Sequence, residues 1–502
     1  MSSGNSPSGL RVALVHPDVP FADRFDRLSR SSLPPLGILY LAACLERAGH
    51  QVLVVDLNLR PSRPELVKRL REWRPQIVGL GTMAPVTLSV LELARTLRRE
   101  LTHRYVLVAG GADATARPRD YLTPGVFDAV LTQESERAIV ALANAWPAIP
   151  REPGLFAAGD DLTAAPEPLV PDEVPFPARH LLPLRDYRGG PAYKKRRHTT
   201  SIFTHRGCAY RCGFCEKSVH PGMMRFRSAP SMLEEIRTIR RDFDIHDIRF
   251  IDDVLMVNRP ALHAFCDLVL EKGERFDWMG CSRIDLMNEE LLHKMARAGC
   301  HRLELGVESG SDRVMRMINK GARPAKAIEA VKRAHRAGIE VIANFILGFP
   351  TETAEEMDAT IDFRSSSNPI TRSTSCSRPS PRRRWFRNIN SRGPTTTASA
   401  SAARPTTTRS IRRKCRTASG ARIRDSISAF PTSRAVWRPS ATCAPPGSFG
   451  NSGDPPFSTW ENARRPSAPR PSRGCVSRVK ARERPRFNAE TLRPRAAVSL
   501  RR

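Results

Sequence analysis

Apolar and polar positions along residues 10–147 follow two alternating patterns. Short runs rich in Val, Leu and Ile predict buried strands, and the stretches between them repeat apolar residues at helical spacing. The predicted strands are residues 11–16, 51–57, 77–83, 105–109 and 128–132. Apolar strands that alternate with helices indicate a parallel sheet covered on both faces. We therefore expect a doubly wound, Rossmann-like α/β domain, whose ligands bind at the carboxyl ends of its strands.

The same alternation returns at residues 198–363, after a Pro-rich stretch at 148–197 that we interpret as an ordered linker. The predicted strands here are residues 200–205, 247–252, 278–283, 302–308 and 341–348. Amphipathic helices separate them, and one opens with the capping-box pattern of Ser231 and Glu234. Repeated strand–helix units of this kind predict a (β/α) barrel of the TIM type, or part of one.

The apolar pattern is lost after Phe363, where residues 364–502 form a tail of different composition. The whole chain has 81 Lys plus Arg and 51 Asp plus Glu, but the tail holds 31 of the basic residues and only five of the acidic ones. Its Leu, Ile, Val and Phe total 16 of 139 residues, which is too few for a hydrophobic core, so we expect disorder. The overall charge of +30 therefore belongs to the tail, and the first 363 residues are close to neutral.

Two interpretations of the tail stay open. Either it is a disordered basic extension that contacts nucleic acid, or the reading frame is shifted after about Phe363 and the tail is its product. We favour the shift, because a helix that begins with a good cap at Thr353 and Glu356 loses its pattern within about ten residues. Arg, Ser, Pro, Thr and Ala are also the residues that out-of-frame GC-rich codons give.

Neither a membrane segment nor a secretory signal is visible in the sequence. No run of 18 apolar residues predicts a spanning helix, and the polar residues 1–9 do not resemble a signal peptide. Clustered cysteines in a long chain of this kind are typical of metal binding or redox chemistry in a reducing compartment. We therefore expect a cytoplasmic protein.

Three cysteines lie within eight residues, in the sequence Cys208-Ala-Tyr-Arg-Cys212-Gly-Phe-Cys215. Zinc sites usually take four ligands, and no fourth cysteine or histidine follows at a suitable spacing. Three thiolates on a cluster of four irons would leave one iron open to a substrate or cofactor. The spacing therefore predicts a catalytic iron–sulfur cluster held by Cys208, Cys212 and Cys215.

This CxxxCxxC motif, with the aromatic Phe214 before its last cysteine, resembles that of the radical S-adenosylmethionine (SAM) enzymes. In that family the open iron of a 4Fe–4S cluster chelates SAM, and reductive cleavage yields methionine and a 5′-deoxyadenosyl radical. The resemblance continues at the ends of later predicted strands. It implies that Asp252 and Asp253 contact the methionine amine. It also implies that Glu308 contacts the ribose or carboxylate and that the segment around Gly348 contacts the adenine.

The preceding domain resembles that of the radical SAM subfamily that binds cobalamin. The resemblance lies in residues 33–56 and in two loops, one ending at Thr82 and one containing Gly110 and Gly111, which it places around the nucleotide tail of cobalamin. The motif Asp-x-His-x-x-Gly, which supplies a cobalt ligand in other cobalamin proteins, is absent, as is common in this subfamily.

This second resemblance implies methylation of an unactivated carbon of a small-molecule or lipid-like substrate. Electrons would come from a donor such as flavodoxin or ferredoxin. The protein binds, orients and excludes water while the cofactors do the bond breaking, so we assign no side chain a catalytic role.

Other functions stay open. The subfamily includes cyclases and rearrangement enzymes. Radical methylthiotransferases share the barrel but carry three further cysteines in their N-terminal domain, whereas residues 1–207 here contain only Cys44. The family barrel has six strands, and only five are recognisable before the tail. A tail that is truly translated would therefore leave an incomplete, inactive remnant, or a basic nucleic-acid-binding protein.

Overall fold

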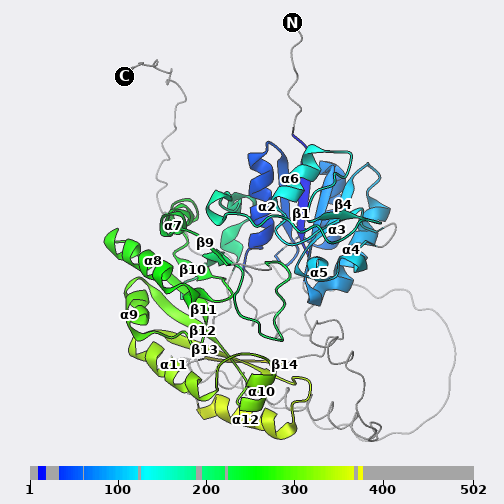
Figure 1. The fold of residues 1–502 in the computed structure, drawn as a ribbon. Helices are drawn as coiled ribbons and strands as arrows, with labels where there is room; N and C mark the ends of the chain where they lie inside the picture. The colour runs from blue at the N-terminus through cyan, green and yellow to red at the C-terminus, as the bar shows by residue number, and fades with distance from the viewer. Residues whose placement is uncertain are drawn as a thin grey trace, which may run out of the picture. The chain divides into compact units, whose positions relative to one another are not determined.

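The computed structural model describes residues 9–18, 33–59, 61–122, 126–187, 195–220, 224–366 and 371–376. The described residues form two β-sheets of six strands each and a small sheet of two strands, with helices packed against the two larger sheets (Figure 1). In this part of the chain no helix combines the length and the apolar character needed to cross a bilayer.

The first sheet has the strand order β2-β1-β3-β4-β5-β6. Its strands are β1 (Arg11–His16), β2 (Gln51–Asp56), β3 (Ile77–Thr82), β4 (Val106–Gly111), β5 (Ala129–Leu131) and β6 (Leu155–Ala157). The first five are parallel, which confirms the doubly wound fold. Strand β6 is antiparallel to β5 and was not predicted, because it lies within the Pro-rich stretch that we interpreted as a linker.

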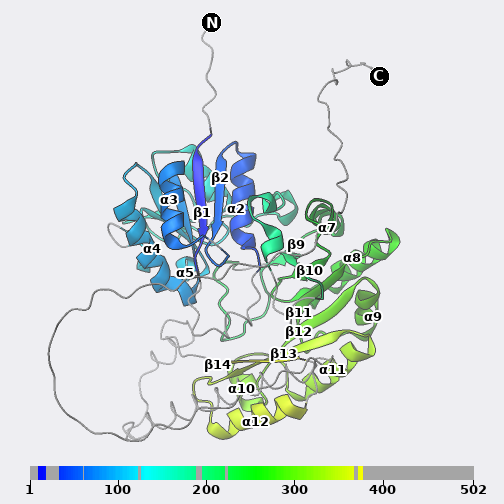
Figure 2. The ribbon, with the colours of Figure 1, turned by 180° about the vertical axis from the view of Figure 1, so that it is seen from behind.

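Helices cover both faces of this sheet (Figures 1 and 2). They are α2 (Leu36–Arg47), α3 (Arg63–Trp73), α4 (Thr87–Glu100), α5 (Ala112–Ala116) and α6 (Glu136–Asn144). Successive residues of β1 serve opposite faces: Val12 packs in the core with α2 and α6, and Ala13 packs in the core with α3 and α4. Burial on both faces explains why these strands read as continuous apolar runs.

The linker after this sheet is ordered where the structure describes it. It contains the short 3-10 helices η3 (Pro171–Glu173), η4 (Arg179–Leu181) and η5 (Leu184–Asp186). The buried Tyr187 hydroxyl donates to Asp56 at 2.7 Å, and Arg179 pairs with Glu235 of the next domain at 2.6 Å. These two contacts tie the linker to the domain before it and to the domain after it. The predicted limits of the linker, residues 148 and 197, stay a prediction.

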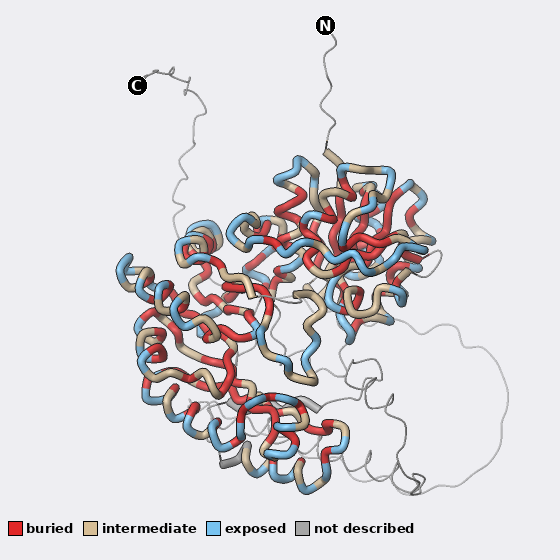
Figure 3. Tube along the Cα trace, viewed as in Figure 1, coloured by how far each residue is buried: buried red, intermediate tan, exposed pale blue. Residues whose placement is uncertain are grey.

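The second sheet is parallel throughout, in the order β14-β13-β12-β11-β10-β7. Its strands are β7 (Thr200–Ile202), β10 (Asp247–Phe250), β11 (Asp277–Arg283), β12 (Cys300–Glu308), β13 (Glu340–Leu347) and β14 (Thr371–Cys376). Its helices are α7 (Ala229–Phe243), α8 (Arg259–Glu271), α9 (Glu289–Arg297), α10 (Asp312–Met317), α11 (Ala325–Arg336) and α12 (Ala354–Ser366). The strands are buried behind a row of helices whose outer surfaces are exposed (Figure 3). This is the expected partial barrel.

Strand β14 corrects the expectation that structure ends at Phe363. Helix α12 continues to Ser366, and β14 pairs with β13 from Ile342 and Thr371 to Leu347 and Cys376. Edge pairing uses backbone N–H and C=O groups, so a segment without apolar alternation can supply a strand. The predicted disorder and frame shift of residues 377–502 lie outside the described residues.

Candidate cofactor sites

The cysteine motif lies in a loop that a small hairpin closes. Strands β8 (His205–Arg206) and β9 (Arg225–Phe226) pair antiparallel on either side of it. Within the loop, the Gly213 N–H donates to the Ile318 carbonyl at 2.8 Å. These contacts hold the loop at its two ends and against the chain that follows α10.

The three cysteines lie near enough in the loop for the charges of Cys208 and Cys212 to act on the thiol of Cys215. All three are free, and Cys215 is exposed. Although the residue as a whole is exposed, partial burial of its thiol group raises the pKa of Cys215 to about 11, and the charges of Asp253, Cys208 and Cys212 add to that rise. Three thiolates that repel one another fit a group that carries compensating positive charge, such as a cluster of iron ions. Among the described residues, no group of three or more His, Cys, Asp or Glu side chains, the three cysteines included, is already arranged to hold a metal ion.

The paired aspartates after β10 differ in their surroundings. Asp252 is buried and accepts hydrogen bonds from the backbone N–H of Thr204 at 2.7 Å and of His205 at 3.0 Å. The Thr204 hydroxyl donates to it at 2.8 Å, and burial raises the pKa of Asp252. Asp252 thus fixes the turn that leads into the cysteine loop, whereas Asp253 is exposed. Cofactor contact by either residue stays a prediction, and Asp253 is the accessible one.

Glu308 ends β12 in a buried ion pair. Its backbone adopts φ +70, and its Oε1 lies 2.7 Å from Nζ of Lys320. The Lys320 Nζ also lies 5.8 Å from the centre of the Phe214 ring, in the cysteine loop. A Cβ on Gly306 would lie 2.4 Å from Glu308 Oε1, so a side chain at position 306 would clash with the ion pair. Lys320 was not predicted, because it follows a short helix rather than a strand.

Gly348 follows β13 with φ +84 and begins a turn that a buried carboxylate holds. The N–H groups of Gly348 and Phe349 donate to Glu352 Oε2 at 2.6 and 3.0 Å. Burial raises the pKa of Glu352 to about 7, although these two donors lower it. The predicted residues Phe214, Glu308 and Gly348 thus lie on segments linked by contacts, since Phe214 and Phe349 have ring centres 5.8 Å apart. Their contact with SAM stays a prediction.

A cavity of about 320 Å³ lies at the carboxyl ends of the first sheet's strands. It is lined by Thr82, Gly110 and Gly111, as predicted for the nucleotide tail, and by two further strand glycines, Gly79 and Gly81. A Cβ on Gly81 would lie 3.3 Å from an Ile38 side-chain atom and one on Gly79 2.9 Å from a Leu14 side-chain atom, so the packing of the protein itself favours glycine at both positions.

Two of the predicted cavity residues also have a structural role. Thr82 Oγ1 accepts the N–H of Ala114 at 2.9 Å and so fixes the start of α5. Gly111 has φ +117, and a Cβ there would lie 2.6 Å from the Thr82 carbonyl oxygen. The packing of β3 against β4 therefore requires glycine at 111, whatever the cavity holds.

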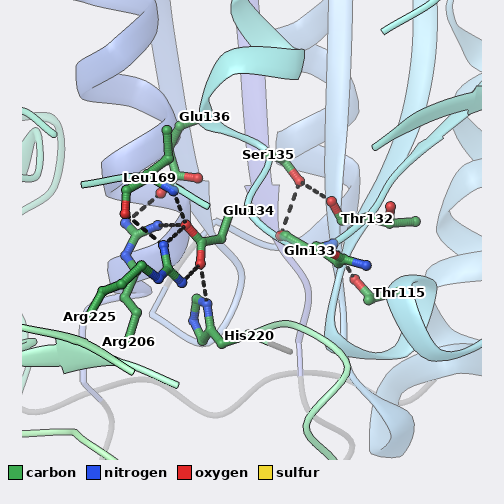
Figure 4. Close-up of polar contacts among 10 residues, drawn as sticks. All are labelled: Thr115, Thr132, Gln133, Glu134, Ser135, Glu136, Leu169, Arg206, His220 and Arg225. Carbon is green, nitrogen blue, oxygen red and sulfur yellow. Dashed lines mark hydrogen bonds and ion pairs between the residues drawn. The ribbon is translucent and has the colours of Figure 1, made fainter. Parts of the chain in front are cut away.

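One wall of the cavity is a charged cluster centred on Glu134, in the loop after β5 (Figure 4). Arg206 approaches Glu134 at 3.2 Å and Glu136 at 2.5 Å, and His220 approaches Glu134 at 3.0 Å. Arg225 forms two further bonds to Glu134. Burial alone would raise the pKa of Glu134, but these cations and donors together hold it well below its usual value. The cluster was not predicted; its sign in the sequence is the pair of acidic residues Glu134 and Glu136, which follow the predicted strand 128–132.

Family models match both halves of the described chain. The model of the radical SAM superfamily matches residues 202–364, and that of the B12 binding domain matches residues 28–143. An uncharacterized methyltransferase of Pyrococcus horikoshii is 29% identical over 365 residues, which cover 70% of this chain and 77% of that protein. The cytidylyl-2-hydroxyethylphosphonate methyltransferase of Streptomyces wedmorensis is 26% identical over 399 residues, covering 67% of this chain and 74% of that protein.

A solved structure shares the fold. It is the radical SAM methyltransferase TsrM from Kitasatospora setae, with cobalamin and a 4Fe–4S cluster bound. It superposes with a TM-score of 0.62 at 19% identity, over 76% of this chain and 78% of that chain. The cysteine loop and the glycine-lined cavity fit the cofactors that the two family domains imply, which are a 4Fe–4S cluster with SAM and a cobalamin. The chain therefore belongs to the radical SAM enzymes that carry a B12-binding domain.

Proposed function

We propose that this enzyme transfers a methyl group from cobalamin to an unactivated carbon of a small-molecule or lipid-like substrate. The observation that carries the proposal is the Glu134 cluster, which joins the two candidate cofactor sites. Glu134 and Glu136 line the cavity of the first sheet, while Arg206 and His220 belong to the hairpin and loop that hold the cysteines. A shared wall of this kind suits chemistry in which both cofactors act on one substrate.

The chain's own residues would bind, orient and exclude water. Cys208, Cys212 and Cys215 would hold the cluster in the closed loop. Lys320 and Glu308 would orient the charged groups of SAM, because their ion pair lies beside Phe214 of that loop. When bound, the cluster with SAM supplies one-electron chemistry, and cobalamin supplies the methyl group. A low-potential donor such as flavodoxin or ferredoxin would supply the electrons. We place the enzyme in the reducing cytoplasm.

The test is anaerobic reconstitution with iron, sulfide and hydroxocobalamin, followed by desalting. We expect the protein to retain a 4Fe–4S cluster that dithionite bleaches, to retain cobalamin, and to release methionine from SAM. The C208A/C212A/C215A variant should lose the cluster and keep cobalamin. Cys300→Ala, which changes a buried thiol away from the loop, should lose neither.

A second pair of variants tests the cavity. Gly37 lines it, and a Cβ at this position would meet nothing within 4 Å. Gly37→Phe should therefore fill the cavity without a clash in the protein, so it should abolish cobalamin retention and leave the cluster intact. Gly37→Ala should retain cobalamin. Stoichiometric zinc in place of iron, or cobalamin retention by Gly37→Phe, would contradict the proposal.

A further inference from the structure

Arg283, the last residue of β11, places its guanidinium against the cysteine loop. Its Nη1 lies 3.6 Å from Sγ of Cys212, within hydrogen-bond distance for sulfur. Its Cζ lies 3.7 Å from the centre of the Tyr210 ring, between Cys208 and Cys212 in the sequence. The Arg283 side chain is only 4% exposed. A buried cation therefore contacts one of the thiols predicted to bind iron.

Other contacts fix the guanidinium in this position. Asp285 accepts hydrogen bonds from Nε at 3.0 Å and from Nη2 at 3.1 Å. The backbone carbonyl of Lys320 accepts a second bond from Nη2. The planar group is thus held on one side by a carboxylate and a carbonyl and on its face by an aromatic ring. Its Nη1 is left directed at the Cys212 sulfur.

We propose that Arg283 is a positioning residue that sets the reduction potential of the cluster held by Cys208, Cys212 and Cys215. The inference rests on the proposed assignment of these cysteines. Reduction adds one electron from a low-potential donor and no proton, so the cluster becomes more negative by one charge. An N–H···S bond from a fixed cation stabilises the more negative state, and hydrogen bonds to sulfur are a known determinant of cluster potential. Burial keeps water from screening this charge.

The test is a redox titration of reconstituted protein, followed by the electron paramagnetic resonance signal of the reduced cluster. We expect Arg283→Gln to shift the midpoint potential to more negative values, by about 59 mV for each tenfold loss in stabilisation of the reduced cluster. Arg283→Lys keeps the charge and should shift it less. The matched control is Arg211→Gln, which removes an exposed cation beside Cys212 and should leave the potential unchanged.

Iron and sulfide content separates the possible outcomes. If the wild-type protein binds no cluster, the proposed function fails. If Arg283→Gln holds four irons at an unchanged potential, or if Arg211→Gln shifts the potential equally, only the role of Arg283 fails. If Arg283→Gln does not hold a cluster, the Arg283→Lys variant becomes the test of the proposal. Its Fe–S(Cys) stretching bands in resonance Raman spectra must then differ from those of the wild type, and unchanged bands with an unchanged potential overturn the proposal.

Discussion

Replacing Glu134 by Gln tests whether the charged wall of the cavity holds the two halves of the described chain together. The substitution keeps the size of the side chain and removes the charge that faces Arg206, Arg225 and His220 (Figure 4). The side chains of Glu134, Arg206 and Arg225 are 5%, 7% and 17% exposed, so water cannot replace the lost partner.

The size of the effect follows from this burial. Removing one partner of a buried ion pair costs about 3–5 kcal/mol, because the other charge is left uncompensated. Arg206 keeps its bond to Glu136 at 2.5 Å, so we expect the lower end, about 3 kcal/mol. The contribution also has a pH dependence of defined sign. The folded pKa of Glu134 is depressed, so its stabilisation is present above the ordinary value of 4.5 and is lost as the pH falls toward the folded pKa.

The measurement is urea unfolding of the cluster-free protein at pH 7 and at lower pH. Glu167→Gln is the matched control, because Glu167 pairs with Arg137 at 3.4 Å with side chains 89% and 53% exposed. An exposed pair of this kind contributes less than about 1 kcal/mol. An equal loss in both variants, or a gap between wild type and Glu134→Gln that widens in acid, would refute the reasoning.

Two further predictions concern buried carboxylates near the cysteine loop. The raised pKa of Glu352, about 7, means that its contribution to stability is full below pH 4.5 and is lost as the pH rises through 7. The melting temperature of Glu352→Gln should therefore exceed that of the wild type at pH 8 and match it at pH 5. Glu356→Gln, which removes a carboxyl with a pKa of about 2, should not reproduce this. Asp252→Ala leaves two buried N–H groups without an acceptor and should cost about 1–3 kcal/mol and reduce iron retention, whereas Asp253→Ala should leave unfolding unchanged. Equal stabilities of the two aspartate variants would contradict the anchoring role of Asp252.

Most of the fold was predictable because its strands are buried on both faces. Residues 77–83 read as an apolar run for that reason, and the matching strand β3 occupies Ile77–Thr82. Strands held mainly by backbone pairing were not predictable. The two-residue strands β8 and β9 and the Ser/Thr-rich β14 show no apolar alternation, and they are recognised only by their partners.

The candidate site was predictable where chemistry fixes the spacing and not where partners are distant in sequence. The cysteine motif is local, so its spacing alone indicated a cluster. Arg283 and Cys212 are 71 positions apart, and Glu134 and Arg225 are 91 apart. Such pairs form only when strands of separate βα units are brought together. The sequence analysis singled out Glu308, but nothing in the sequence identified its partner Lys320.

Strand β14 is compatible with both interpretations of the tail. It is held to β13 along six paired positions through its backbone, and such pairing places little demand on side chains. A shifted frame would therefore not prevent the sixth strand from forming. Translating the gene across codons 355–375 in all three frames separates the two interpretations. A second frame that continues the alternation of strand and helix assigns the basic tail to a shift, and the charge of +30 then carries no functional meaning. If no frame continues it, the tail is a genuine part of the protein, and two interpretations gain support together: contact with nucleic acid through its 31 basic residues, and an inactive remnant of the enzyme.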